Sequence, residues 1–119
     1  MIAREKNLET KVKIFLTSEG CWWVKYWGGG AYTKAGVPDL LVCCEGVFLG
    51  VELKAARGRP SELQIHELHK IRDSGGLAIL LYPDDLTTFK NLIHAIKGNR
   101  PMVVAACMEI FEERIKKYE

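Results

Sequence analysis

The chain has 119 residues and a mass of 13.4 kDa, which is the size of one ordinary domain. Apolar residues make up 48% of it and charged residues 27%, a composition that excludes a disordered protein. The formal net charge of +2 neither requires nor excludes a nucleic-acid partner. No apolar run approaches the ~20 residues of a membrane helix, and the N-terminal residues lack the apolar block of a secretion signal. We therefore expect a single domain over residues 1–119 that has no membrane partner and works in the cytoplasm.

Four cysteines are present, and two of them are adjacent at Cys43 and Cys44. No CxxC pair indicates a zinc site or a redox motif. We expect these two cysteines, with Cys21 and Cys107, to be buried reduced thiols that act as small apolar residues.

Hydrophobic spacing and turn residues predict elements in the order α-β-β-β-α-β-α-α. Residues 4–19 have apolar side chains at helical spacing, and Gly20 is placed to end that helix. Residues 21–27 are aromatic and β-branched, which is typical of a strand, and a Gly28-Gly29-Gly30 loop follows. Alternation in this strand puts Trp23 on one face and Trp22 on the other, so one of the two faces belongs to the core.

Two apolar runs, 39–44 and 47–54, are separated by Glu45-Gly46 and predict a β-hairpin. Residues 61–74 predict a helix that Gly75-Gly76 ends, and residues 77–82 predict a fourth strand. Two further helices are predicted at 84–97 and 101–118. The fold class is therefore α/β, with a small mixed four-stranded sheet flanked by helices.

The final predicted helix carries an apolar stripe with two possible uses. The stripe could complete the core of the monomer, or it could pair with its copy in a twofold homodimer. Its members are Val104, Cys107, Met108, Phe111, Ile115 and Tyr118.

The hairpin register brings two acids together. A turn at Glu45-Gly46 pairs Asp39 directly with Glu52, and Lys54 projects from the same face. Opposed carboxylates repel each other, so a cation is expected between them. Hard divalent ions such as Mg²⁺ or Mn²⁺ take carboxylate and carbonyl oxygens as ligands, and Lys54 could then act on an attacking water or on a phosphate.

The alternative is a surface hairpin with an ordinary ion pair between Glu52 and Lys54. The apolar side chains on both faces of the hairpin argue against that alternative, because charges at the end of a covered hairpin are costly unless they are used. The face of Asp39 carries Leu41, Cys43, Phe48 and Gly50, and we expect it to be covered.

Three segments together resemble the VRR-NUC family, a branch of the PD-(D/E)xK nuclease superfamily. They are Gly36-Val-Pro-Asp-Leu-Leu41, Gly50-Val-Glu-Leu-Lys54, and a helix with Gln64 that ends Ile71-Arg-Asp-Ser-Gly-Gly76. The resemblance runs from about Glu5 to Lys97 and implies a restriction-endonuclease-like core over about residues 4–97.

The resemblance also implies site residues. Asp39 and Glu52 would bind the metal, assisted by the backbone carbonyl of Leu53, and Lys54 would be catalytic. An acid on the first helix would approach the metal, directly or through water. Glu5 fits that position, and Glu9, one helical turn later, is its rival.

Gln64 has two interpretations. Ser61-x-x-Gln64 is a capping box, in which Gln64 bonds back to the Ser61 amide. The helical stripe of Gln64 with Leu68 and Ile71 points instead toward the sheet, where the family pattern has an active-site glutamine. We treat Gln64 as a site residue that contacts substrate or water. His66 and His69, in contrast, are expected to be solvated helix residues, since no third soft ligand is near.

Basic and aromatic residues near these motifs are candidates for DNA contacts. Arg57 and Arg59 follow the Glu52-x-Lys54 strand in a short loop, which suits phosphate contacts if it is not simply a solvated turn. Lys25, Tyr32 and Lys34 flank the glycine loop, where bases at a branch point could stack.

The sequence therefore predicts a Mg²⁺- or Mn²⁺-dependent endonuclease that acts on branched DNA. Stand-alone members of the family resemble Holliday-junction resolvases, and two symmetric cuts suit a homodimer. The expected location is the cytoplasm of a bacterium or of a phage-infected host. The alternatives are a non-catalytic DNA-binding or assembly subunit that keeps the fold, and a flap-type nuclease.

Overall fold

The computed structural model describes the backbone of residues 2–119 and the side chains from residue 7 onward. Its elements are α1 (Ile2–Ser18), β1 (Trp22–Lys25), β2 (Leu40–Cys44), β3 (Val47–Leu53), α2 (Glu62–Asp73), β4 (Leu77–Leu81), the short 3₁₀ turn η1 (Pro83–Asp85), α3 (Leu86–Lys97) and α4 (Pro101–Lys116). The predicted order of helices and strands is confirmed. The first strand is shorter than the predicted 21–27, and Pro83 starts a 3₁₀ turn where the third helix was expected to begin.

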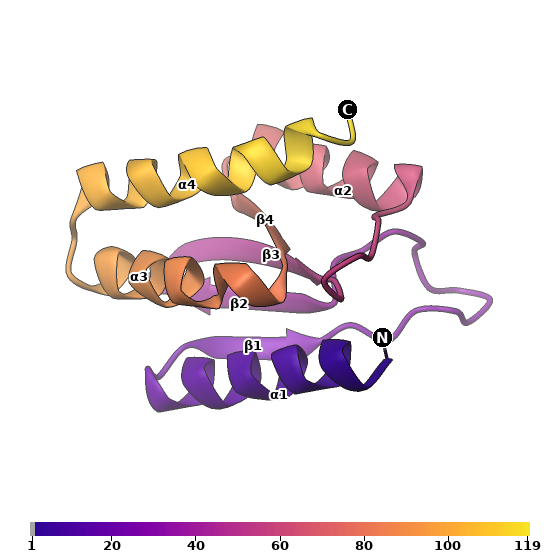
Figure 1. Cartoon of the computed structure of the whole chain (residues 1–119), viewed down its shortest axis with the longest axis horizontal. Coiled ribbons are helices and arrows are strands. Elements are labelled where there is room, and N and C mark those ends of the chain that lie inside the picture. The colour runs from indigo at the N-terminus through magenta and orange to yellow at the C-terminus, as the bar shows by residue number, and fades with distance from the viewer. Residues whose placement is uncertain (1) are drawn as a thin grey trace.

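The four strands form one mixed sheet in the order β1-β2-β3-β4. The first two pairings are antiparallel, and β3 pairs with β4 in parallel through the crossover that contains α2. Figure 1 shows α1 and α3 together on one side of the sheet. Buried side chains of α2 contact β4 on the opposite face. The predicted α/β class and the helix-flanked mixed sheet are therefore confirmed.

The hairpin between β2 and β3 has the predicted register. Glu45 and Gly46 both have positive φ angles, of 49° and 79°, which are the values that a tight two-residue hairpin turn requires. Cys44 pairs with Val47, and the ladder continues to Leu40 opposite Val51. The next position along this ladder places Asp39 beside Glu52.

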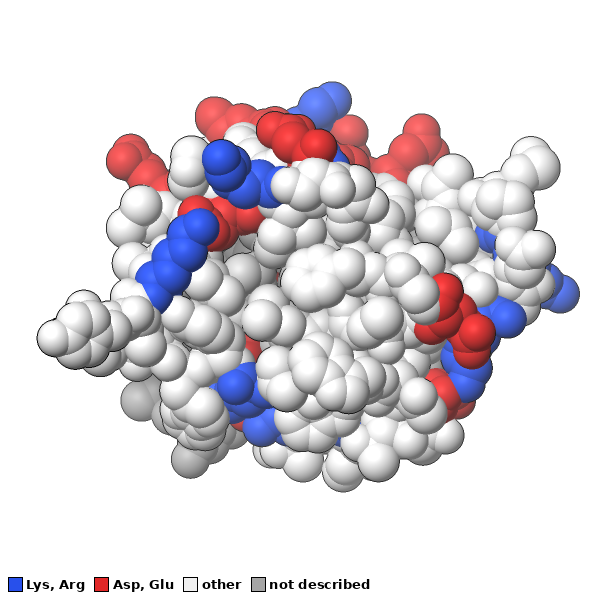
Figure 2. Space-filling model, turned by 180° about the vertical axis from the view of Figure 1, so that it is seen from behind, with Lys and Arg blue, Asp and Glu red and all other residues white. Residues whose placement is uncertain are grey.

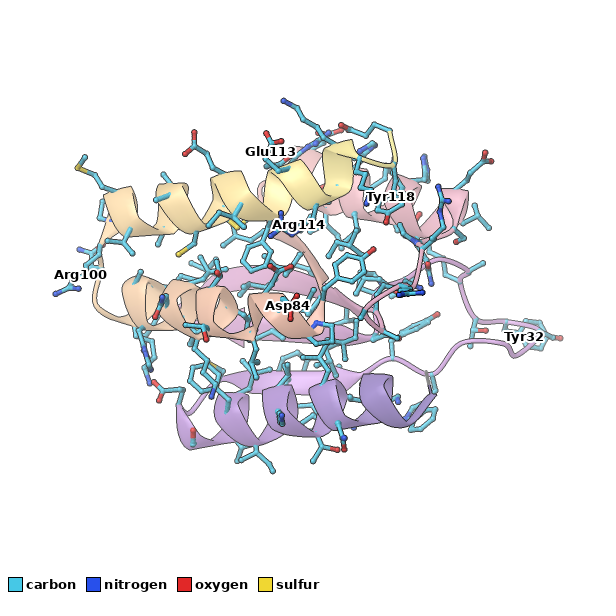
Figure 3. All side chains as sticks on the ribbon, viewed as in Figure 1. Tyr32, Asp84, Arg100, Glu113, Arg114 and Tyr118 are labelled. Atoms are coloured by element: carbon cyan, nitrogen blue, oxygen red, sulfur yellow. The ribbon has the colours of Figure 1, made fainter. Side chains whose placement is uncertain are left out.

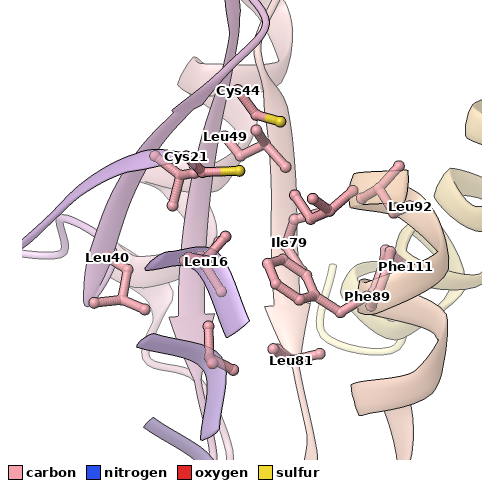
Figure 4. Close-up of a cluster of buried hydrophobic side chains, with 14 of the residues drawn as sticks. Leu16, Cys21, Leu40, Cys44, Leu49, Ile79, Leu81, Phe89, Leu92 and Phe111 are labelled. Carbon is pink, nitrogen blue, oxygen red and sulfur yellow. The ribbon is translucent and has the colours of Figure 1, made fainter. Parts of the chain in front are cut away.

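The main core lies between the sheet and the pair α1 and α3. Figure 4 shows Leu16 of α1, Leu49 of β3 and Phe89 of α3 meeting there. All four cysteines are free, as predicted, and burial raises the pKa of Cys44 to about 12. Cys43 is exposed on the outer face of β2, so the expectation that every cysteine is buried is wrong for this one. Alternation along β2 places it on the face opposite Cys44.

The apolar stripe of α4 packs inside the chain. Phe111 is fully buried in the main core, and Ile115 is 1% exposed in a second cluster with α2 and β4. An ion pair fixes the helix further, since the Arg114 guanidinium donates two hydrogen bonds to buried Asp85, of 2.9 and 3.0 Å. Of the two uses considered for the stripe, the structure supports completion of the core.

Replacing Phe111 by Ala is expected to destabilise the chain by about 3–5 kcal/mol, the usual cost of such a cavity in a packed core. Urea unfolding followed by circular dichroism measures this cost. Ile110→Ala, at a neighbouring position that is 39% exposed, is the control and should change stability by less than about 1 kcal/mol. Equal costs for the two variants would contradict the packing of α4 described above.

No helix within residues 2–119 combines the length and the apolar character needed to cross a membrane.

Candidate active site

Asp39 joins three strands at one corner of the sheet. Its main-chain carbonyl accepts a hydrogen bond of 2.8 Å from the Tyr26 amide, just beyond the end of β1. Its carboxylate Oδ2 accepts a second bond of 2.8 Å from the Leu53 amide at the end of β3. Buried Pro38 precedes it and cannot donate a backbone hydrogen bond. These two contacts fix the backbone and the carboxylate of Asp39 at the open end of the hairpin.

Glu52 and Lys54 lie at the same corner. Glu52 is 2% exposed, and it lies close enough to Asp39 for the charge of that residue to raise its pKa. Lys54 Nζ lies 3.3 Å from Glu52 Oε2 and is itself largely buried. The structure therefore brings together the three residues that the hairpin register predicts to share a face.

Burial of two acids with one lysine changes their protonation. Removal from water, together with the charge of Asp39, raises the pKa of Glu52 to about 8. Burial also raises the pKa of Asp39, although the Leu53 amide and Lys54 oppose the rise. At neutral pH the carboxyl pair of the metal-free chain therefore retains about one proton, because the positive charge of Lys54 does not fully offset two carboxylates.

The donor set fits a hard divalent cation. Two carboxylates and the Leu53 carbonyl are oxygen ligands, which Mg²⁺ and Mn²⁺ prefer, and both ions commonly complete their shell with water. A bound cation would replace the shared proton and keep both carboxylates ionised. Among the side chains that the structure describes, no cluster of three or more His, Cys, Asp or Glu is positioned to hold a metal. Beyond Asp39 and Glu52, the Leu53 carbonyl and water are available as ligands, and Glu5, whose side chain is not described, stays a candidate from α1.

The two candidates for the acid on α1 differ in what the structure shows. The side chain of Glu5 lies outside the described residues. Glu9 accepts hydrogen bonds from Lys13, at 2.6 Å, and from Lys25, at 2.8 Å. Burial opposes ionisation of Glu9, but the two lysines outweigh it and lower its pKa. Its charge reaches the site, since it contributes to the raised pKa of Asp39.

Gln64 serves the capping box and also faces the site. Its side-chain Oε1 accepts a hydrogen bond of 2.8 Å from the Ser61 backbone amide, while the backbone amide of Gln64 donates to Ser61 Oγ at 3.1 Å. Gln64 also lines a cleft of about 430 Å³ together with Asp39 and the glycine loop 28–30. The two interpretations of Gln64 are thus compatible in one structure.

Gly36 allows the segment that carries Asp39 to pack closely against α2. The sequence pattern did not predict this role. The φ angle of Gly36 is +83°, and an added Cβ would lie 2.6 Å from the Leu63 carbonyl oxygen of α2. A larger residue would push the segment that carries Asp39 away from the start of α2.

The candidate DNA-contacting residues differ in their exposure and in their contacts within the chain. Figure 3 shows Tyr32 at the tip of the long loop between β1 and β2, away from the body of the protein, and its side chain is fully exposed. Lys34, in the same loop, pairs with Glu67 of α2 at 3.1 Å. Lys25 is turned inward to Glu9, and its Nζ lies 4.4 Å from the centroid of the Trp27 ring.

The two arginines of the loop after β3 also differ. Arg57 is exposed in a tight turn that the Gly58 amide closes onto the Ala55 carbonyl. The Arg59 guanidinium lies over the ring of Tyr118, 5.6 Å from its centroid. The two histidines of α2 match expectation in part, because His66 is exposed whereas His69 approaches Glu119 at 2.7 Å.

Tyr26 and Glu67 organise the glycine loop, and sequence reasoning did not single them out for this. The Tyr26 hydroxyl accepts a hydrogen bond of 2.8 Å from the Lys34 amide and donates one of 3.2 Å to the Lys34 carbonyl. Strand alternation, which puts Tyr26 in the row of Asp39 and Glu52, was the available signal for Tyr26. No local pattern pointed to Glu67.

The fold and this corner define a restriction-endonuclease-like protein. A family model described as archaeal Holliday junction resolvase (Hjc) matches residues 1–82, from α1 to the end of β4. The chain belongs to this family. No curated protein and no solved structure matched it. Helices α3 and α4 lie beyond the matched region.

Proposed function

We propose that the chain is a metal-dependent, structure-selective endonuclease that hydrolyses phosphodiester bonds in branched DNA such as Holliday junctions. The observation that carries this proposal is the buried carboxyl pair of Asp39 and Glu52 with Lys54 beside it. Membership of the resolvase family supports the choice of substrate. Within the PD-(D/E)xK superfamily, the motifs favour the VRR-NUC branch. The location that we propose is the cytoplasm.

Asp39, Glu52 and the Leu53 carbonyl would hold Mg²⁺ or Mn²⁺, with Glu5 or Glu9 behind them. A bound ion of this kind lowers the pKa of a coordinated water and stabilises charge on the phosphate. The chain itself contributes position and charge. Lys54 places an ammonium group at the carboxylates, where it can orient water or offset charge on a phosphate oxygen. Gln64, which lines the cleft, would contact substrate or water.

Replacing Lys54 by Ala is expected to lower turnover by about 100-fold or more, the usual loss for a group that stabilises developing charge. Metal binding should persist, because the carboxylates and the Leu53 carbonyl remain. Single-turnover cleavage and titration calorimetry with Mn²⁺ separate the two effects. Loss of metal binding in this variant would show that Lys54 holds the site together instead of acting in the reaction.

The proposed DNA surface consists of Lys25, Tyr32, Lys34, Arg57 and Arg59. Tyr32 is free to stack on an unpaired base at a branch point, and exposed Arg57 is free to contact a phosphate. The ion pairs of Lys25 with Glu9 and of Lys34 with Glu67 must compete with DNA. We therefore expect smaller contributions from these two lysines.

Arg57→Ala and Arg59→Ala are each expected to reduce the slope of log affinity against log salt by about one, since each phosphate contact releases about one counterion. All DNA shapes should be weakened to a similar extent. Arg100→Ala removes the same charge at the opposite end of the molecule from Tyr32, as Figure 3 shows, and is the matched control. Slopes that are equal in all three variants would show that the 57–59 loop is a solvated turn without phosphate contacts.

The proposed selectivity is tested with purified protein, Mn²⁺ and matched four-way junction, flap and duplex DNA. We expect the junction to be cut at least about 10-fold faster than duplex. Faster cutting of flaps would identify a flap-type nuclease. Tight junction binding without cutting, under any divalent metal, would instead identify a non-catalytic subunit that keeps the fold.

A further inference from the structure

The centre of one side of the molecule carries no charge. Figure 2 shows a broad central area without charged residues there. On the sheet, Trp22 is 59% and Phe48 40% exposed, and Cys43 is exposed as well. The expectation that this face of the hairpin would be covered is therefore wrong for β1 and β2, because α2 reaches it no further than β3, where Ile71 packs on Gly50. Affinity for DNA depends on cations that neutralise phosphates, so the phosphate contacts have to come from other surfaces.

Arg59 is an exposed cation that an aromatic ring holds. It lies in the loop after β3, and its guanidinium is over the ring of Tyr118, 5.6 Å from the centroid. Lys25 and Lys34 pair with carboxylates of α1 and α2, whereas no carboxylate of residues 7–119 forms an ion pair with Arg59. Arg59 therefore keeps its charge for a ligand, although its side chain has a partner within the chain.

Contact with a ring leaves the hydrogen-bond donors of an arginine free. The guanidinium is planar, so a ring on one of its faces does not use the N–H groups, which point outward in the plane. The attraction between cation and ring also restrains a long side chain that otherwise loses its rotamer freedom only on binding. A guanidinium held in this way can meet a phosphate with two parallel N–H hydrogen bonds.

The hydroxyl of Tyr118 fixes the ring in turn. A hydrogen bond of 3.2 Å joins it to the Tyr82 hydroxyl, which donates one of 2.9 Å to the Gly58 carbonyl. A carbonyl can only accept, so the single proton of Tyr82 goes to Gly58 and Tyr118 donates to Tyr82. Burial raises the pKa of Tyr82, which therefore keeps this proton at neutral pH. The ring that holds Arg59 is thus tied, through Tyr82, to the residue that precedes Arg59.

Gly58 connects this arrangement to the candidate active site. Its amide closes a turn onto the Ala55 carbonyl at 2.8 Å, and an added Cβ would lie 3.4 Å from Lys54 Cβ. Lys54 Nζ is in turn 3.3 Å from Glu52 Oε2. The loop that carries Arg59 therefore packs against the lysine proposed to act in the reaction, so a phosphate close to the scissile bond is the ligand that Arg59 would meet.

We infer that Tyr118 is a positioning residue for DNA binding, whose ring holds the Arg59 guanidinium ready for a backbone phosphate. The inference rests on the proposed function, because Arg59 must meet DNA. Figure 3 shows Tyr118 at the end of α4 that is nearer to Tyr32 and away from Arg100. Lys117 Nζ, 5.8 Å from the same ring centroid, adds a second cation beside it. The end of α4, outside the region matched by the family model, thus gains a role in binding.

The test is a double-mutant cycle on the affinity for a four-way junction, with a chelator present so that the DNA stays intact. Tyr118→Leu removes the ring and should weaken binding about 2- to 10-fold, the cost of ordering one long side chain on binding. Tyr118→Phe keeps the ring and should weaken binding less than about 2-fold. In an Arg59→Ala background, Tyr118→Leu should have no further effect, because the side chain that the ring holds is gone.

Arg57→Ala is the matched control, since it removes an exposed arginine two residues earlier in the same loop. In that background Tyr118→Leu should weaken binding by the same factor as in the wild type. A merely structural role of Tyr118 would give equal losses in all backgrounds. An equal effect of Tyr118→Leu with and without Arg59, or wild-type affinity in Tyr118→Leu, would overturn the inference.

The order of the Arg59 side chain gives a second readout that needs neither DNA nor a substitution. In the free wild type, ¹⁵N relaxation of the Nε–H group should show a more rigid side chain for Arg59 than for Arg57, because only the first lies over a described ring. An Arg59 side chain as mobile as that of Arg57 would overturn the inference, even if Tyr118→Leu fails to fold.

Failure of the inference and failure of the proposed function give different results. A wild type that binds no junction at any salt concentration would overturn the proposed function and, with it, the phosphate contact of Arg59. Junction binding and cleavage by the wild type, with additive effects of Tyr118→Leu and Arg59→Ala, would leave the function intact and overturn the inference alone.

Discussion

Glu52→Gln and Asp39→Asn are each expected to reduce junction cleavage by more than about 100-fold while the chain remains folded. Loss of a group that merely supports a metal ligand commonly costs 10–100-fold, so loss of a ligand should cost at least as much. Gln and Asn keep the size of the side chain but cannot supply the negative charge that holds a divalent ion. Cleavage of a labelled four-way junction with Mn²⁺ measures the loss.

The same substitutions should not destabilise the metal-free protein. Each one removes one of two adjacent buried carboxyl groups, and therefore relieves repulsion that Lys54 offsets only in part. Glu45→Gln makes the same chemical change in the exposed turn at the other end of the hairpin and should leave cleavage unchanged. Wild-type activity in either site variant would show that the two acids do not form the active site.

The stability of the metal-free chain is expected to fall as pH rises from about 5 to about 8, by an amount on the order of a few kcal/mol. The cause is Glu52, whose pKa rises from its usual 4.5 to about 8 because it is buried beside Asp39. Below a pH of about 4.5, Glu52 is protonated in both the folded and the unfolded chain. Between the two values the folded chain binds more protons than the unfolded chain, so each step toward higher pH favours unfolding.

Urea unfolding at a series of pH values in the presence of a chelator measures this slope. Glu52→Gln cannot titrate at that position and should lose much of the decline. Added Mg²⁺ should stabilise the wild type more at the upper end of the range, where no proton has to leave the site. A wild-type stability that rises steadily between about pH 5 and 8, in parallel with the variant, would contradict the raised pKa of Glu52.

The hairpin and its acids could be predicted because local signals determine them. Glu45-Gly46 adopts the positive φ angles of a tight turn, and the period of two along each strand then fixes which residues face one another. Once the turn is known, Asp39, Glu52 and Lys54 must share a corner. The same local logic correctly placed Gly20 at the end of α1 and the Ser61–Gln64 capping box at the start of α2.

The remaining features depend on contacts between distant segments. An apolar stripe on α4 is the same pattern whether it meets its own sheet or a second chain, so the sequence left both possibilities open. Local patterns could not show that Lys25 turns to Glu9 or that Lys34 reaches Glu67, because each pair joins different elements. The exposed rows of β1 and β2 were missed for a related reason: alternation identifies two faces but not which one a helix covers.

The most direct test of the account is cleavage of a four-way junction, labelled on each strand in turn, with Mn²⁺ and with a chelator. We expect paired nicks at symmetry-related positions with the metal, none with the chelator, and none with Glu52→Gln under either condition. A junction that the folded protein binds yet leaves intact with every divalent ion would contradict the account, as would cleavage that continues in the chelator.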